Sequence, residues 1–228
     1  METILAIAAE GRELAGIAAR MTGVCRLAWG IEYSTRGRFA GRDWILVAHG
    51  AGPRRASSAF ETAIGHARPS AVLSTGFCGG LNSSLEPGQV FVALRVLAES
   101  GESFDTAHGG GGTLFSGNRV ISSPVEKHRL HQATGAVAVD MEAAAVAAKA
   151  AAQHLPFFCV RVVTDTASEG FSIDLNAARD TEGRIGATRV VRQALRRPLT
   201  GIPEMIRLWN RSRLAAHQLG EYLAHYDF

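Results

Sequence analysis

The chain alternates short apolar runs with segments of helical spacing, and this alternation restricts the fold more than any other feature. The apolar runs of strand length are 4–8, 45–48, 71–74, 135–139 and 157–163. Residues 39–44 form a hairpin pattern, so an antiparallel stretch is expected at 24–48. Helices are predicted at 10–21, from Pro53 to about 68, at 124–132, at 176–196 and at 204–226, with a loop at 100–112 and a break at 198–203. Strands that alternate with helices indicate a sheet covered by helices. We predict an α/β fold, a three-layer α/β/α sandwich around a central mixed β-sheet.

Size and composition predict one domain. The 228 residues are 46% hydrophobic and 20% charged, which suits a single domain over residues 1–228 with a C-terminal helical extension at about 201–228. The net charge of +3 is mild. The arginines gather after Arg179, but aromatic residues are not interleaved as in a single-strand binder, so no nucleic-acid partner is expected.

The cysteines and the apolar runs indicate the cellular compartment. The three cysteines are far apart and form no CxxC or Cys/His cluster, so we expect no metal site and a reducing cytoplasm. The chain start lacks a basic region, and the longest apolar runs are shorter than a bilayer span. The sequence therefore predicts a cytoplasmic protein, with membrane contact only if its substrate is a lipid.

Polar residues follow several of the predicted strands. Ligands of such sheets bind beyond the carboxyl ends of the strands. That edge would collect Glu10–Glu13, His49–Arg54, Thr75–Gly80, Asp140–Glu142 and Thr164–Asp165. This convergence predicts a small-molecule site. The glycine-rich turns in it match neither GxGxxG nor a Walker motif, which disfavours a dinucleotide oxidoreductase.

The acids at this edge allow two interpretations. Asp140 near an N-cap and Glu142 in the first turn of an Ala-rich helix are ordinary helix-start acids. Partly buried carboxylates can also donate a proton or accept hydrogen bonds from a vicinal diol. With Asp165, these roles suit cleavage of an N-glycosidic bond, because the leaving base needs a proton and the sugar gains positive charge.

Longer motifs favour the second interpretation. The chain resembles the purine nucleoside phosphorylase and methylthioadenosine/S-adenosylhomocysteine nucleosidase family. The stretches that carry the resemblance are Ala8–Glu10, His49–Gly52, Ser74–Leu81, Pro87–Val90, Val139–Ala145 and Arg161–Asp165. The last helices are similar to a hopanoid-biosynthesis-associated branch. The resemblance implies a nucleoside phosphorylase-like fold and an enzyme acting on a purine nucleoside, with adenine as the expected base and an adenosyl-hopane-like lipid as a candidate substrate.

The resemblance also implies roles for single residues. Glu142 would bind the ribose 2′- and 3′-hydroxyls, and Met141 would pack on the sugar. Asp165 would protonate or hydrogen-bond N7 of the purine, supported by Thr164. The further substrate-binding candidates are Thr75, Gly76, Phe77, Val120 and Ile121.

The residues that would hold the nucleophile depart from the family pattern. Aligning Ala8-x-Glu10 puts Arg12 where nucleosidases carry the acid that activates water; Glu13 serves only if the register shifts by one. Arginine suits phosphate better, yet Ser74 and Phe77 occupy the positions of the phosphorylases' phosphate ligands. Water and phosphate both stay open as nucleophile. Phe77 would line a larger or more apolar pocket.

Other expectations follow from the same resemblance. No metal or organic cofactor is implied, although phosphate can be a co-substrate. Family members form dimers or hexamers, so a homo-oligomer is expected. Two alternatives stay open: a methylthioadenosine/S-adenosylhomocysteine nucleosidase, and a non-catalytic nucleoside-binding protein that has lost both attack-side patterns.

Overall fold

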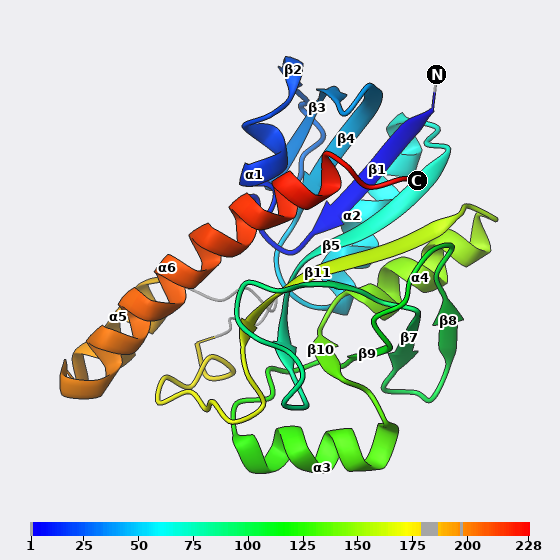
Figure 1. The fold of residues 1–228 in the computed structure, drawn as a ribbon. Helices are drawn as coiled ribbons and strands as arrows, with labels where there is room; N and C mark the ends of the chain where they lie inside the picture. The colour runs from blue at the N-terminus through cyan, green and yellow to red at the C-terminus, as the bar shows by residue number, and fades with distance from the viewer. Residues whose placement is uncertain (1, 179–186, 197) are drawn as a thin grey trace.

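The computed structural model describes residues 2–178, 187–196 and 198–228. In this part of the chain one mixed sheet of eleven strands is covered by helices (Figure 1). Its strands are β1 (Thr3–Ala8), β2 (Thr22–Arg26), β3 (Tyr33–Phe39), β4 (Arg42–Ala48), β5 (Ala71–Gly80), β6 (Val90–Val92), β7 (Arg95–Ala98), β8 (Ser103–Asp105), β9 (Thr113–Ser116), β10 (Ala138–Asp140) and β11 (Phe157–Asp165). Its helices are α1 (Ala15–Ala18), α2 (Pro53–His66), α3 (Pro124–Thr134), α4 (Ala143–Ala152), α5 (Ala187–Arg196) and α6 (Pro198–Leu223).

The sheet is mixed, as predicted. Its main path runs β2-β3-β4-β1-β5-β10-β9-β7-β8, and β11 pairs with β5 and β6. Strand β1 lies parallel to β4 and β5, and β11 lies parallel to β5. The turn at Ala40–Gly41 joins β3 to β4 as an antiparallel hairpin. The parallel strands therefore direct their carboxyl ends to a common edge.

Alternate residues of β1 enter two different cores, one on each face of the sheet. Leu5 and Ile7 pack in the core that contains α2 and α4. Ile4 and Ala6 pack in the core that contains α1 and the end of α6. Both faces are buried, because a strand directs successive side chains to opposite sides. These layers confirm the predicted three-layer α/β/α sandwich.

The glycine-rich stretch at 75–80 was predicted as a turn, and this prediction is wrong. It forms the second half of β5, where β11 pairs with residues 72–79. Pairing with β11 over 75–79 and with β10 at Gly79 and Gly80 keeps the stretch extended despite its glycines, and Gly76 takes a φ of 130° that favours glycine. The strand therefore continues into the edge where the site was predicted.

Three other element predictions need correction. The predicted helix at 10–21 is limited to α1, because turns occupy residues 9–14. The loop predicted at 100–112 contains β8. Of the helix predicted at 176–196, α5 forms the end, and residues 179–186 lie outside the described residues.

The break predicted at 198–203 is also wrong, because α6 runs through it with Pro203 inside. Pro203 is the sixth residue of α6, so it removes the donor that would pair with the Leu199 carbonyl, and the helix continues across it. The far half of α6 is fixed on the core by close backbone contact between Gly16 and Gly220. A Cβ on Gly220 would lie 2.3 Å from the Gly16 carbonyl oxygen.

Candidate active site

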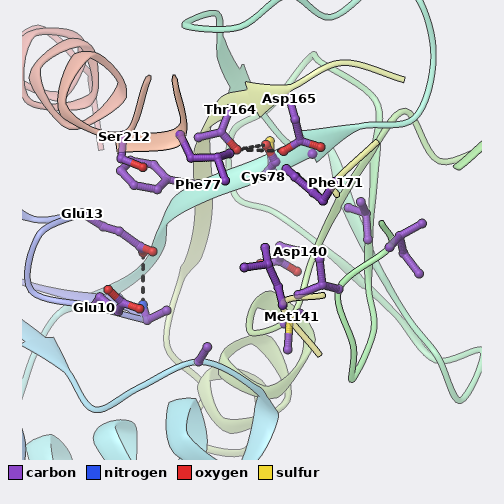
Figure 2. A pocket seen from close by; sticks show the side chains of 18 of the residues that line it. Glu10, Glu13, Phe77, Cys78, Asp140, Met141, Thr164, Asp165, Phe171 and Ser212 are labelled. Atoms are coloured by element: carbon purple, nitrogen blue, oxygen red, sulfur yellow. Dashed lines mark hydrogen bonds between the residues drawn. The ribbon is translucent and has the colours of Figure 1, made fainter. Parts of the chain in front are cut away.

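A cavity of about 420 Å³ lies at the carboxyl ends of β1, β10 and β11 (Figure 2). This volume is in the range of small-molecule sites. The predicted site residues that line it are Arg12, Glu13, Phe77, Val120, Ile121, Met141, Glu142, Thr164 and Asp165. The structure thus brings together nine side chains that are spread over residues 12–165.

Two predicted binding residues are not among those that line the cavity. Thr75 is buried, and its hydroxyl donates to the Val160 carbonyl oxygen at 3.0 Å. Gly76 lies behind Glu13, and a Cβ on Gly76 would lie 2.2 Å from Glu13 Oε2. Gly76 therefore provides the space in which the Glu13 carboxylate lies.

Glu13 is the buried acid at the end of β1. It follows the turn after β1, and its Oε2 accepts a hydrogen bond from the Ala9 N–H at 3.2 Å, drawn as a dashed line in Figure 2. The residue is 8% exposed. Burial, together with the carboxylates of Glu142 and Glu10, raises the pKa of Glu13 from 4.5 to about 8. Glu13 can therefore exchange a proton near neutral pH.

Arg12 also lines the cavity, but unlike Glu13 its side chain is largely exposed to solvent. Its side chain is 57% exposed, and its Nε lies 2.6 Å from a carboxylate oxygen of Glu10. The structure therefore agrees with the alignment that is shifted by one residue, in which Glu13 and not Arg12 takes the position of the acid. Glu13 occupies the buried position, and Arg12 forms an ion pair at the rim.

Glu142 lies where β10 meets α4. It is the N-cap residue of α4, so the prediction that it lies in the first turn is off by one position. Its Oε1 accepts from the Gly52 N–H at 2.6 Å, and its Oε2 lies 3.3 Å from the Met141 nitrogen. Burial and the Asp140 carboxylate raise the pKa of Glu142 to about 7. Glu142 is thus a hydrogen-bond acceptor whose ionisation depends on pH near neutrality.

Asp140 has the predicted capping role and a second partner that the sequence did not reveal. Its Oδ2 accepts from the Ala143 N–H at 3.0 Å and from the Arg161 Nη2 at 2.5 Å. Arg161 is 1% exposed and also donates to the Ser74 hydroxyl at 2.8 Å. Its positive charge opposes the rise in the pKa of Glu13 and of Glu142. This buried pair connects β10, β11 and β5 beneath the cavity.

Asp165 ends β11 and accepts hydrogen bonds at both of its oxygens. The Thr164 hydroxyl donates to Oδ1 at 2.9 Å, and the Lys127 ammonium donates to Oδ2 at 2.5 Å (Figure 2 shows Thr164 and Asp165). Burial raises the pKa of Asp165, and the positive charge of Lys127 opposes that rise. The pKa of Asp165 therefore depends on the balance between burial, which raises it, and the Lys127 charge, which lowers it.

Lys127 is the main residue in contact with a predicted site residue that the sequence did not reveal. It is fully buried, and its ammonium group also donates to the carbonyl oxygens of Thr166 at 2.6 Å and Glu169 at 3.0 Å. All three of its protons are therefore used. The helical pattern at 124–132 places Lys127 among Glu126 and His128, so no local signal separates it from a solvated residue.

Val120 lines the same cavity as Asp165 and presents a paired backbone donor and acceptor. Its N–H donates to the Asn176 Oδ1 at 2.9 Å, and its carbonyl accepts from the Asn176 Nδ2 at 2.9 Å. The structure therefore places Val120 in the cavity wall, near Ile121 and Phe171. Cys78 also lines the cavity, and burial raises the pKa of its thiol well above the ordinary value.

The remainder of the wall is apolar and comes mostly from segments near the end of the chain. The residues that form it are Phe77, Leu175, Val190, Val191, Met205, Leu208 and Trp209. Helices α5 and α6 thus close one side of the cavity. The arginine-rich sequence of these helices favours a solvated or subunit-contact face, so the sequence alone does not connect them with the site.

Solved structures share this fold. The nucleosidase for 5′-methylthioadenosine and S-adenosylhomocysteine from Neisseria meningitidis, in complex with methylthio-immucillin-A, has a TM-score of 0.73 at 19% identity, over 99% of this chain and 100% of that one. A putative nucleosidase of that name from Borrelia burgdorferi, bound to adenine, has a TM-score of 0.74 at 16% identity, over 97% of each chain. These matches confirm the predicted nucleoside phosphorylase-like fold.

Sequence comparisons agree. The 5′-methylthioadenosine/S-adenosylhomocysteine nucleosidase of Lysinibacillus sphaericus is 25% identical over 182 residues, which cover 64% of this chain and 78% of that protein. The Mycobacterium tuberculosis protein of the same name is 33% identical over 79 residues, 31% of each chain. The model of the phosphorylase superfamily matches residues 31–111 and 106–196. The chain therefore belongs to the phosphorylase superfamily and is an enzyme.

Proposed function

We propose that this enzyme cleaves the N-glycosidic bond of a purine nucleoside. The observation that carries the proposal is the presence of three carboxylates, Glu13, Glu142 and Asp165, around one cavity. Each has a raised pKa. Glycosidic cleavage needs a proton at the leaving base, acceptors at the sugar hydroxyls and an activated nucleophile on the other side of C1′. One carboxylate is available for each task.

Asp165 is the proposed acid for the leaving base. In its protonated form it would donate to purine N7, and Lys127 would stabilise the carboxylate that this transfer leaves behind. The 2.5 Å contact between Lys127 and Oδ2 supports this pairing, because a nearby cation makes a buried acid a better proton donor. Thr164 holds the other oxygen and fixes the orientation of the carboxyl group.

Glu142 is the proposed ribose ligand. Its Oε1 is held by the Gly52 N–H, so the carboxylate is oriented before any substrate binds. An ionised carboxylate accepts up to four hydrogen bonds, which leaves capacity for the 2′- and 3′-hydroxyls. Met141 lines the same part of the cavity and offers an apolar surface for the sugar.

Glu13 is the proposed base that activates water. Its buried position supports water over phosphate, because a phosphate dianion beside Glu13 and Glu142 would face two carboxylates. Arg12 is already paired with Glu10, and Arg161 is paired with Asp140. Glu13 also weakens the case for a non-catalytic nucleoside-binding protein, since that alternative was based on the loss of the attack-side acid.

Adenine is the proposed base, because Val120 offers one backbone donor and one backbone acceptor in the cavity wall. The primary amide of Asn176 satisfies both groups in this structure. Adenine carries the same pair as this amide, an acceptor at N1 next to an amino donor at N6. Hypoxanthine has the reverse pair and would leave both Val120 groups facing like partners.

The substrate is further proposed to carry an apolar 5′-substituent. The apolar wall formed by Met205, Leu208 and Trp209 supports this proposal. A methylthio group has this property, and so does an adenosyl-hopane-like lipid, the substrate that the sequence resemblance implied. The two differ in size, so their relative rates would distinguish a methylthioadenosine/S-adenosylhomocysteine nucleosidase from a lipid nucleosidase.

The direct experiment is to incubate the protein with adenosine, methylthioadenosine and inosine, with and without phosphate, and to measure free base and ribose 1-phosphate. We expect adenine release without phosphate, faster with an apolar 5′-group, and slow release from inosine. Release that requires phosphate would instead establish a phosphorylase. If no nucleoside in an extended panel with apolar 5′-groups loses its base, the proposed activity is wrong.

A further inference from the structure

Helices α5 and α6 form a hairpin. Its tip, where α5 ends at Arg196 and α6 begins at Pro198, extends away from the sheet at the orange end of the ribbon in Figure 1. Ala194 of α5 packs directly on Gly201 of α6, where a Cβ on Gly201 would lie 2.7 Å from the Ala194 Cα. The far half of α6 is anchored on the core at Gly220. The tip is therefore a defined structure held at a distance from the body of the enzyme.

This tip is strongly apolar at its surface. Leu199, at the start of α6, is 91% exposed, and Leu195, in the last turn of α5, is 63% exposed. The large apolar side chains on α5 and α6 that are exposed to solvent are Val191, Leu195, Leu199, Ile206, Trp209, Leu214 and Tyr222. Exposed apolar residues that gather on one element indicate a binding surface.

Apart from the buried Glu204, the charged residues that the structure describes on α5 and on α6 as far as Arg213 are arginines. The arginines described on α5 and α6 are Arg189, Arg192, Arg196, Arg207, Arg211 and Arg213. The acid in this part of α6, Glu204, is 7% exposed and accepts hydrogen bonds from the backbone of residues 172 and 173. Arg207 and Arg211 pair with Glu169, and Asp174 lies in the loop beside α5.

The tip is continuous with the active-site cavity. Val191 and Trp209 line the cavity and are also 41% and 56% exposed. Arg213 covers the Trp209 ring, with its guanidinium carbon 4.9 Å from the ring centroid. The rim of the cavity therefore combines a tryptophan, an arginine and aliphatic side chains, which is the composition of helices that lie at a membrane interface.

We propose that the α5–α6 hairpin docks this enzyme on an anionic phospholipid bilayer, with Leu195 and Leu199 in the interface and Arg192 and Arg196 on the headgroup phosphates. Docking would place the apolar rim of the cavity against the lipid. A second copy of this chain is a poorer occupant, because packing two such tips against each other would bring arginines face to face. None of the described helices combines the length and hydropathy needed to span a membrane, so the contact is peripheral.

The test is co-sedimentation of the full chain with vesicles of phosphatidylcholine alone and of phosphatidylcholine mixed with phosphatidylglycerol. We expect binding to the anionic vesicles that weakens with salt. Arg192→Gln with Arg196→Gln should weaken it by roughly thirtyfold, because each basic residue near an anionic surface contributes about a fivefold factor. Leu195→Ser with Leu199→Ser should weaken it similarly or more.

Matched controls carry the same changes elsewhere. Val24→Ser with Val125→Ser removes two apolar residues that are 54% and 60% exposed, and Arg36→Gln with Arg129→Gln removes two exposed arginines. These controls should bind as the parent protein does. The idea is overturned if anionic vesicles bind no better than neutral ones, if the controls lose as much binding as the tip variants, or if the tip variants dissociate a dimer that does not bind vesicles. The measurement needs no substrate, so it is independent of the proposed activity.

Discussion

Replacing Glu13 with glutamine should abolish activity and at the same time stabilise the protein at high pH. The amide keeps the size of the side chain but can neither accept a proton nor ionise. If Glu13 activates water, base release should fall by roughly a hundredfold or more, which is the usual contribution of a general base. Glu99→Gln changes an exposed acid far from the cavity and should have no effect.

The stability change follows from the raised pKa of Glu13. The folded state holds the proton more tightly than the unfolded chain, so the stabilisation is complete below pH 4.5 and is lost as the pH rises through about 8. A rise from 4.5 to about 8 corresponds to roughly 5 kcal/mol at 1.36 kcal/mol per pH unit, which is an upper bound because the site can admit water. Glu13→Gln removes this loss, since glutamine stays neutral at every pH.

Urea unfolding from pH 4 to pH 9 measures the difference. The free energies of unfolding of the parent and Glu13→Gln should be close at the acid end and should diverge by several kcal/mol at the alkaline end, with the variant the more stable. If the free energies of unfolding of the two proteins change in parallel from pH 4 to pH 9, Glu13 is not buried in the folded protein. An unchanged rate of base release would refute its role as the base.

Three further predictions concern the same cavity. Lys127→Met should lower the free energy of unfolding by about 3–5 kcal/mol, because it leaves Asp165 as an unpaired buried charge, and adding Asp165→Asn should restore part of that loss; additive effects in the double variant would contradict the ion pair. Asn176→Ala should lower the KM for adenosine by up to about tenfold, because the Asn176 amide no longer competes for the Val120 backbone, whereas a higher KM would indicate a purely structural contact. With a 4-nitrophenyl riboside, whose leaving group needs no proton from Asp165, kcat/KM of the parent enzyme should fall at least tenfold for each pH unit below about 8, because attack requires ionised Glu13, and a flat profile between pH 6 and pH 8 would exclude Glu13 as the base.

Much of the fold was predictable from periodicity. Apolar runs at 4–8 and 157–163 became β1 and β11, and Pro53 started α2 as its sequence position indicated. The errors fell where tertiary contacts override local preference. Glycines at 75–80 suggest a turn, but pairing with β11 and β10 holds them extended. Pro203 suggests a break, but α6 continues across it, with Gly201 packed on α5 and Gly220 packed on the core.

The site was predictable to the extent that it depends on strand ends. Asp165, Glu142 and Met141 line the cavity as predicted, because each lies at or just after the end of a strand that the sequence indicated. The choice between Arg12 and Glu13 was not predictable, because one residue of register in a turn decides which side chain is buried. Lys127 was not predictable either, since its partner lies 38 residues away in the sequence.

The most direct test of the central claim separates proton donation from every other role of Asp165. The parent and Asp165→Asn can be compared in two rates: the release of adenine from adenosine, and the release of nitrophenolate from a 4-nitrophenyl riboside. The nitrophenolate leaves without a proton, so the variant should lose most of its activity on adenosine and keep most of its activity on the nitrophenyl riboside. Equal losses on both substrates, or full activity on adenosine, would contradict acid catalysis by Asp165 and with it the proposed cleavage of a purine nucleoside in this cavity.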